Sequence, residues 1–154
     1  MAAGVRKAPK LVPHPLRAGE RQVLAAALTK SKLPVDDLEA PGHFFWRFET
    51  VDEVPVGFGG LEVYGTDALL RSLVTLPPVR NRGVGSAIVA ALEFEAGLLG
   101  CRSIWLLTTS AAEFFGRLGY AKCDRAVVPE TIMETQEFVS LCPTTADVLV
   151  KRIG

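Results

Sequence analysis

The spacing of apolar residues changes at a pair of prolines in the middle of this chain, and this change constrains the fold more than any other feature. Before it come three runs rich in β-branched and aromatic residues, separated by short turns, which predict consecutive antiparallel strands. The runs cover residues 44–51, 56–64 and 69–76. Pro77 and Pro78 end the third run, because proline cannot donate to a sheet ladder. From Val84 to Leu99 the apolar residues recur at helical spacing, so a helix follows.

The other elements are predicted by the same criteria. They are a first strand from residue 10 to 13, a helix at 20–30, a buried strand at 104–108, a short helix at 111–118, a strand from Tyr120, a helix starting near Pro129 and a last strand at 148–152. This order predicts an α/β (α+β) domain with a mixed, mostly antiparallel central sheet flanked by helices. We expect residues 1–154 to form one domain, with residues 1–8 as a loose tail.

Charge and composition exclude several classes of protein. The 17 Lys and Arg residues offset the 17 Asp and Glu residues, which argues against nucleic acid or an anionic membrane as the main partner. Glu93 and Glu95 interrupt the best apolar run, and the N-terminus does not resemble a secretory signal. Three widely spaced cysteines suit reduced thiols in the cytoplasm, and no set of ligands has the spacing of a metal site.

The segment from residue 73 to 86 carries the strongest functional signal, because it runs from a strand through a tight turn into a helix. Gly83 and Gly85 leave room for an anion at the helix N-terminus, where unpaired N–H groups and a partial positive charge lie. Arg80 and Arg82 would add charge-assisted hydrogen bonds to phosphate. A dinucleotide fingerprint requires glycine where Ile88 stands, and a Walker loop is absent. A glycine turn with two solvated arginines is the alternative.

A second motif follows at residues 111–120, with the sequence Ala-Ala-Glu-Phe-Phe-Gly-Arg-Leu-Gly-Tyr. Together with Arg80-x-x-Gly83-x-Gly85, it resembles the acyl-CoA-binding half of the GNAT N-acetyltransferases. The resemblance is close over residues 56–120 and looser in the first third of the chain. It implies the GNAT fold, acetyl-CoA as the co-substrate and a soluble enzyme that acylates an amine.

The resemblance also implies roles for individual residues. The backbone of Leu73, Val74 and Thr75 would pair with the pantetheine arm, and the N–H of Val74 would hold the thioester oxygen. Thr108 stands where many relatives have a CoA-contacting asparagine. The pyrophosphate would be held by Arg80, Asn81, Arg82, Gly83, Val84, Gly85 and Ser86.

Phe115 departs from the pattern of the family. Many relatives have a tyrosine at this position, which returns a proton to the departing thiolate, and phenylalanine cannot donate one. Another group or water would supply the proton, or the thiolate would leave unaided. The ring would still pack against the pantetheine arm.

Glu62 is the predicted general base, since it lies in an apolar strand next to the strand expected to hold the thioester. Strand alternation places it on the same face as Phe58 and Tyr64; a solvent-facing glutamate is the alternative. Arg71 and Ser72 would bind an acidic substrate or orient Glu62, although Arg71 would equally suit a solvated position on the strand.

A narrower resemblance connects the chain with the N-acetyltransferases of arsenic operons. It depends on short matches that include residues 60–62, 69–73, 107–109 and 141–143. It implies a detoxifying acetylation but gives no substrate. The leading hypothesis is therefore transfer of an acetyl group to a small-molecule amine by direct attack, with a homodimer as one possible assembly. A non-catalytic acyl-CoA sensor and a protein or peptide acetyltransferase are the alternatives.

Overall fold

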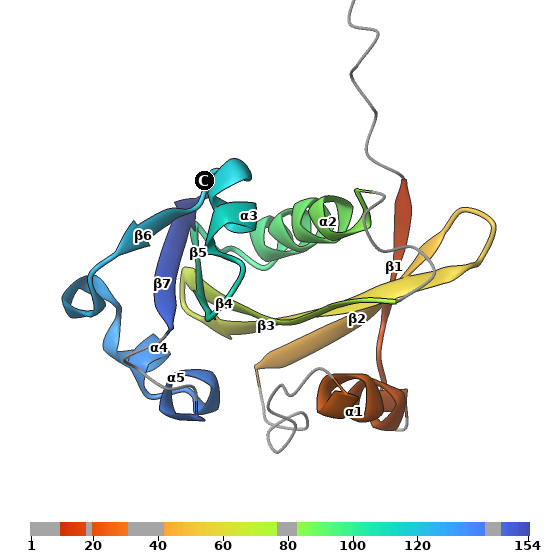
Figure 1. Cartoon of the computed structure of the whole chain (residues 1–154), viewed down its shortest axis with the longest axis horizontal. Helices are drawn as coiled ribbons and strands as arrows, with labels where there is room; N and C mark the ends of the chain where they lie inside the picture. Colours follow the sequence, from red (N-terminus) through yellow and green to blue (C-terminus); the bar gives the residue numbers. More distant parts are fainter. Residues whose placement is uncertain (1–9, 18–19, 31–41, 77–82, 141–145) are drawn as a thin grey trace, which may run out of the picture.

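The computed structural model describes residues 10–17, 20–30, 42–76, 83–140 and 146–154. The strands are β1 (Leu11–Pro15), β2 (His43–Thr50), β3 (Pro55–Tyr64), β4 (Asp67–Thr75), β5 (Ser103–Thr108), β6 (Ala121–Cys123) and β7 (Asp147–Arg152). The α-helices are α1 (Arg21–Lys30), α2 (Val84–Leu98), α3 (Ala112–Arg117), α4 (Glu130–Met133) and α5 (Gln136–Ser140), and a 3-10 turn covers Arg125–Val127. Figure 1 shows their arrangement.

The strands form one sheet in the order β1-β2-β3-β4-β5-β7-β6. All neighbours are antiparallel except β4 and β5, which pair in parallel. That pairing is short and runs only from Asp67 opposite Ser103 to Leu69 opposite Trp105. Trp105 Nε1 donates to Asp67 Oδ1 at 3.0 Å and fixes this end. Beyond it, the second half of β4 has an edge that β5 does not cover.

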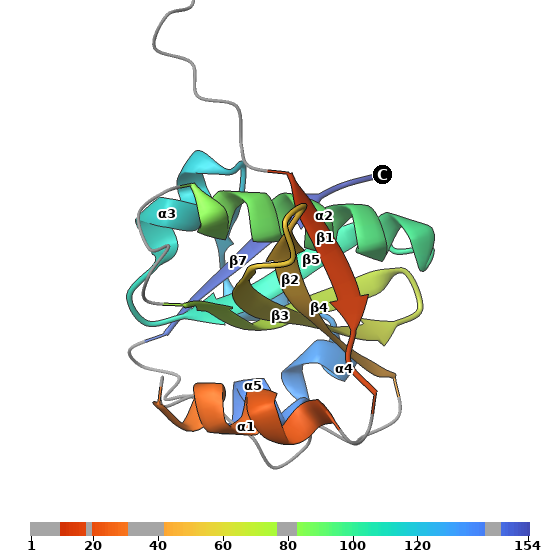
Figure 2. The ribbon, with the colours of Figure 1, turned by 90° about the vertical axis from the view of Figure 1, so that its right-hand side faces the viewer.

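Helices cover both faces of the sheet, as Figure 2 shows. One face carries α2 and α3, and the other carries α1, α4 and α5. Buried hydrophobic residues form one core on the first face and two cores on the second. The core under α2 includes Phe48, Leu61, Ile88, Leu92 and Leu106. The opposite face holds two smaller cores, one with Leu24, Leu28, Phe45, Phe58 and Val74 under α1, the other with Leu69, Trp105, Ile132, Phe138 and Val148 near α4 and α5.

A bulge interrupts β4 next to its uncovered half. Phe58 lies opposite Val74, but Gly60 lies opposite Arg71, so two residues of β4 face a single residue of β3. One of the two, Ser72, has a φ of 61°, in the left-handed region that residues other than glycine rarely adopt. Such a conformation persists only where the surrounding structure holds it, and it is typical of functional sites.

The sequence-based elements are confirmed, with most boundaries within two residues. The prediction of one helix after Pro129 is wrong, because two short helices, α4 and α5, replace it. Thr135 breaks the helix between them: its hydroxyl donates to the Ile132 carbonyl oxygen at 2.7 Å and accepts from the Phe138 N–H at 3.3 Å. Within the described parts of the chain, no helix is long and apolar enough to cross a membrane.

Candidate active site

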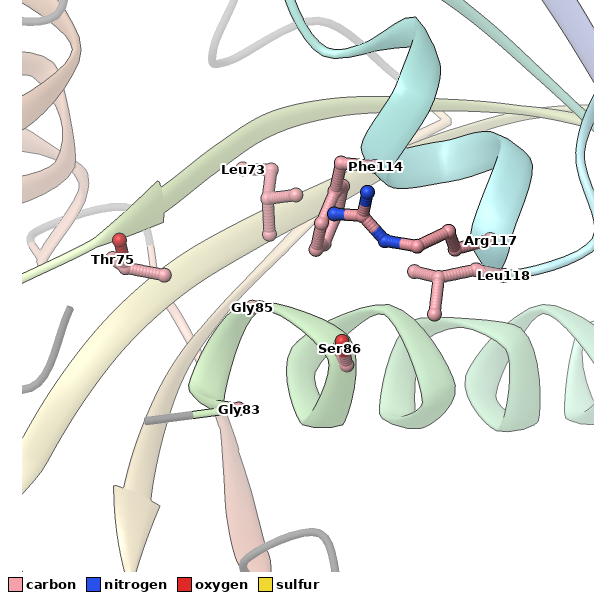
Figure 3. Close-up of a pocket in the computed structure, with 8 residues that line it drawn as sticks. All are labelled: Leu73, Thr75, Gly83, Gly85, Ser86, Phe114, Arg117 and Leu118. Atoms are coloured by element: carbon pink, nitrogen blue, oxygen red, sulfur yellow. The ribbon is translucent and has the colours of Figure 1, made fainter. Parts of the chain in front are cut away.

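A pocket of about 600 Å³ lies between the uncovered half of β4, the N-terminus of α2 and one side of α3 (Figure 3). It is lined by Leu73, Thr75, Gly83, Gly85, Ser86, Phe114, Arg117 and Leu118. The strand and the helix N-terminus come from the first motif of the sequence, at residues 73–86. The second helix comes from the second motif, at residues 111–120. The fold therefore brings these two motifs together around one space, which we call the donor pocket.

The helix side of the donor pocket is shaped by glycine. Gly83 precedes α2 with a φ of 75°, and no described side chain caps the first turn of the helix. A Cβ atom built on Gly85 would lie 3.3 Å from Cζ of Phe114, tighter than ordinary van der Waals contact. The N–H groups of this turn therefore face the pocket with little side chain in front of them, as an anion-binding helix N-terminus requires.

The strand side of the donor pocket presents backbone groups from alternate residues. Leu76 N–H donates to the Val56 carbonyl oxygen at 2.9 Å, so the N–H groups on this side of the strand point to β3. Because N–H groups alternate along a strand, that of Val74 also points to β3, and those of Leu73 and Thr75 point to the uncovered edge. The predicted role of the Val74 N–H does not fit this register, and Leu73 is the better candidate.

The helix α3 contributes Phe114, Arg117 and Leu118, which share one side of the helix at i, i+3 and i+4 spacing. Phe115, the aromatic residue predicted to pack against the pantetheine arm, lies instead in the core with 5% of its surface exposed. Its ring makes edge contacts with Phe114 and Tyr120, at centroid distances of 5.0 and 5.5 Å. The sequence analysis missed Phe114 and Arg117, although helical spacing on the second motif would have identified both.

Five other predicted CoA contacts lie elsewhere or outside the described residues. The Thr108 hydroxyl accepts from the Ala111 N–H at 2.9 Å and so fixes the start of α3 rather than lining the pocket. The side chain of Val84 is buried under α2, which leaves only its backbone for a ligand. Arg80, Asn81 and Arg82 fall in the range 77–82, outside the described residues.

On the opposite face of the sheet, Glu62 is the centre of a buried polar cluster. Its carboxylate is fully enclosed, so the solvent-facing alternative is wrong. The hydroxyl of Tyr64 donates to Oε1, and Nε2 of His43 lies 3.2 Å from the same oxygen. The guanidinium of Arg71 donates to Oε2 at 2.8 Å. The sequence analysis missed His43, which faces Glu62 across β2 and β3.

Arg71 joins this cluster to the β4 bulge. Its side chain is fully buried, so the alternative of a solvated strand residue is wrong. Its Nε donates to the Ser72 hydroxyl at 3.1 Å and lies 3.9 Å from Oε1 of Glu137 on α5. The guanidinium also lies 5.5 Å from the centre of the Phe45 ring. Arg71 thus connects β3, β4 and α5 next to the residue with the left-handed backbone.

The environment of Glu62 favours its ionised form. Burial alone would raise the pKa of this carboxyl group, but hydrogen bonds from His43, Tyr64 and Arg71 outweigh burial and lower the pKa below its ordinary value of 4.5. The carboxylate is therefore charged near neutral pH. The cysteines differ: burial raises the pKa of the Cys101 and Cys123 thiols, which lowers the fraction of thiolate. Cys142 lies outside the described residues, and within them no cluster of His, Cys, Asp and Glu could hold a metal ion.

Comparison with known families agrees with this geometry. The acetyltransferase (GNAT) domain matches residues 41–122, which is more than half of the chain. The chain belongs to the GNAT acetyltransferase family. Its enzyme class is accordingly that of the acyl-CoA-dependent N-acyltransferases.

Solved structures of other GNAT proteins share the fold at low sequence identity. N-acetylglutamate synthase from Neisseria gonorrhoeae, complexed with coenzyme A and N-acetyl-glutamate, matches 96% of this chain with a TM-score of 0.77 and 19% identity. The chain spans only 36% of the length of that synthase. Rv2747 from Mycobacterium tuberculosis, complexed with CoA, matches 92% of this chain and 98% of its own length, with a TM-score of 0.71 and 22% identity. Aminoglycoside 6'-acetyltransferase type Ii matches 93% of this chain and 97% of its own length, with a TM-score of 0.68 and 20% identity.

Proposed function

We propose that this GNAT protein transfers the acetyl group of acetyl-CoA to the amine of a small molecule by direct attack. The observation that supports this most is the β4 bulge, which lies between the donor pocket on one face and a buried charged cluster on the other. Solved GNAT proteins that act on amino acids, polyamines and aminoglycosides share the fold, which is consistent with an amine of this size.

The donor pocket fits coenzyme A in both shape and chemistry. We assign the backbone N–H groups of Gly85 and Ser86 to the pyrophosphate, with the side chain of Arg117 as an added cation. The uncovered edge at Leu73 and Thr75 would pair with the amides of the pantetheine arm, and Phe114 would pack against it. The N–H of Leu73, next to the bulge, would stabilise charge on the acyl oxygen.

When bound, acetyl-CoA supplies an activated acyl carbon: the amine nitrogen bonds to this carbon, and the bond from the carbon to sulfur breaks. The amine must first lose a proton, and Glu62 is the candidate acceptor. Because His43, Tyr64 and Arg71 enclose Glu62, the half-buried Tyr64 is the connecting group. Tyr64 lies six residues along β3 from Phe58, so water would relay the proton of the amine to the Tyr64 hydroxyl oxygen as the hydroxyl proton passes to Glu62. Glu62→Gln and Tyr64→Phe should then lower kcat to a similar extent, with the KM for acetyl-CoA unchanged.

No such relay is proposed for the thiolate that leaves. Phe115 is buried and has no proton to give, so the thiolate would leave unaided or take its proton from water. This departure from the usual tyrosine is compatible with catalysis, since a thiol is a good leaving group.

The biological role that the sequence resemblance supports is arsenic detoxification in the cytoplasm, with a homodimer as the proposed assembly. Cys101 and Cys123 lie in separate hydrophobic cores on opposite faces of the sheet, which argues against arsenical binding by these two thiols together, so the proposed role depends on acetylation alone. A strain that expresses the protein should grow at arsenical concentrations that inhibit the parent strain. Equal growth of the two strains would contradict the role in detoxification but would not contradict the proposed acetyl transfer.

The test of the proposed reaction is release of free thiol from acetyl-CoA in the presence of a panel of amino acids, polyamines and aminoglycosides. We expect release that depends on the amine, with an acetylated product of the corresponding mass. Saturable binding of acetyl-CoA without turnover on any member of the panel would favour the sensor. Turnover only with peptides would favour a protein or peptide acetyltransferase.

A further inference from the structure

A second pocket, of about 400 Å³, lies between α1 and the sheet, on the face opposite the donor pocket. Its walls are mostly apolar: Val23, Ala26 and Ala27 come from α1, and Phe58 and Val74 come from β3 and β4. The volume is in the range typical of pockets for small ligands. The proposed donor site uses none of these five residues.

The two pockets meet at the end of β4. Thr75 lines both of them, and side chains alternate along the strand, so Leu73 faces the donor pocket and Val74 faces the second pocket. An acceptor amine has to reach the acyl carbon at this strand while coenzyme A fills the donor pocket. The second pocket provides an approach from the other face.

The charges around the second pocket restrict what it can bind. Arg47 lines it, but its Nε lies 2.7 Å from Oε2 of Glu49, and its Nη1 lies 3.4 Å from Oε2 of Glu20. These carboxylates neutralise the guanidinium and raise its pKa. Lys30, in the last turn of α1, makes no ion pair with any acidic residue that the structure describes. Among the residues that the structure describes, the pocket therefore combines apolar walls with a cation, Lys30, that no described carboxylate neutralises.

From this combination, we infer that the second pocket is the acceptor site and that the acceptor is an amine with an apolar body and a carboxylate. The apolar body would pack against Phe58, Val74 and the alanines of α1, and the carboxylate would pair with Lys30. The inference rests on the proposed acetyl transfer and adds to it the class of acceptor. It predicts that polyamines, which have neither feature, are poor substrates.

The first experiment compares acceptors that differ by one feature. Rates of thiol release are measured with phenylalanine against phenethylamine, and with 4-(aminomethyl)benzoate against benzylamine, with spermidine as the polar reference. In at least one of the two pairs, we expect the amine with a carboxylate to have a kcat/KM about fivefold higher than the amine without one, since a partly exposed ion pair contributes up to about that factor. Efficient turnover of spermidine with no preference for either carboxylate would overturn the inference and leave the proposed function intact. No turnover of any amine, with acetyl-CoA still bound, would instead overturn the proposed function.

The second experiment tests the location of the site with matched variants. Ala26→Trp places an indole at the pocket wall, and Ala90→Trp places one on the exposed side of α2, away from both pockets. Lys30→Met removes the pocket cation, and Lys122→Met removes an exposed cation on β6. Lys30→Met should raise the KM for the acceptor by up to about fivefold, and Ala26→Trp by at least as much. Both should leave the KM for acetyl-CoA within twofold, whereas the control variants change neither. If Ala26→Trp and Lys30→Met behave like their controls, the acceptor binds elsewhere.

Discussion

The two sides of β4 are built in different ways. The donor pocket consists of backbone groups, glycines and one helix N-terminus, with side chains that are partly exposed. The cluster around Glu62 and Arg71 consists of buried charged side chains that are hydrogen-bonded to one another. The donor side can therefore bind a ligand without changing its own contacts, whereas the internal contacts of the cluster also fix the strand that carries the bulge.

Arg71 gives the largest expected effect and tests this comparison directly. Arg71→Met would leave Glu62 and Glu137 buried without their shared cation, which typically costs about 3–5 kcal/mol of unfolding free energy. Arg47→Met breaks a pair that is partly exposed and should cost at most about 1 kcal/mol. Urea unfolding measures both. If the two variants lose similar amounts of stability, the cluster does not hold this part of the fold together.

Gly85 should show the opposite behaviour, with a loss of ligand binding and no loss of stability. Gly85→Val places a branched side chain against Phe114 at the mouth of the helix N-terminus, so acetyl-CoA binding should weaken at least about tenfold. Gly97→Val adds the same groups to α2 where a Cβ atom meets nothing within 4 Å. Calorimetric titration should therefore find acetyl-CoA affinity lost only in the Gly85 variant. An unchanged affinity there would remove the assignment of the pyrophosphate to this turn.

The difference between the donor pocket and the buried cluster also explains which parts of the site could be predicted from the sequence. The donor pocket could be predicted because the strand, the glycines at 83 and 85 and the helix are consecutive, and their conformations are set by local backbone chemistry. Phe114 and Phe115 show the limit of that reasoning. A motif places two aromatic residues side by side, but the packing of α3 on α2 and β7 decides which ring lines the pocket.

The cluster could be predicted only in part, because its members come from separate elements. Strand alternation placed Glu62 and Tyr64 on one face, as observed. The pairing of His43 with Glu62, and the approach of Glu137 to Arg71, depend on sheet register and on the position of α5. The left-handed conformation of Ser72 likewise follows from the register shift between β3 and β4, which no local pattern marks.

The pH dependence of stability offers a smaller test of the cluster. The pKa of Glu62 is lower in the folded protein than its ordinary value of 4.5, so its ionised form stabilises the fold above that pH. This contribution is lost as the pH falls from 4.5 through the folded pKa, at about 1.4 kcal/mol for each unit of difference. Glu62→Gln has no such titration. The stability advantage of the parent protein over the variant should therefore shrink below pH 4.5, as measured by urea unfolding at a series of pH values. A constant advantage at all these values would mean that the carboxyl group titrates alike in both states.

The smallest expected effects come from the two adjacent phenylalanines, and they define the border between the donor pocket and the core. Phe114→Leu removes contact area from the pocket wall, so acetyl-CoA should bind a few-fold more weakly with unfolding free energy nearly unchanged. Phe115→Leu acts inside the core between Phe114 and Tyr120 and should cost about 1 kcal/mol of stability with nearly normal binding. Titration with acetyl-CoA and urea unfolding, performed on both variants, measure the two effects separately. The reverse result, with binding lost only in the Phe115 variant, would show that this ring contacts the donor and that the wall of the pocket lies one residue further along α3.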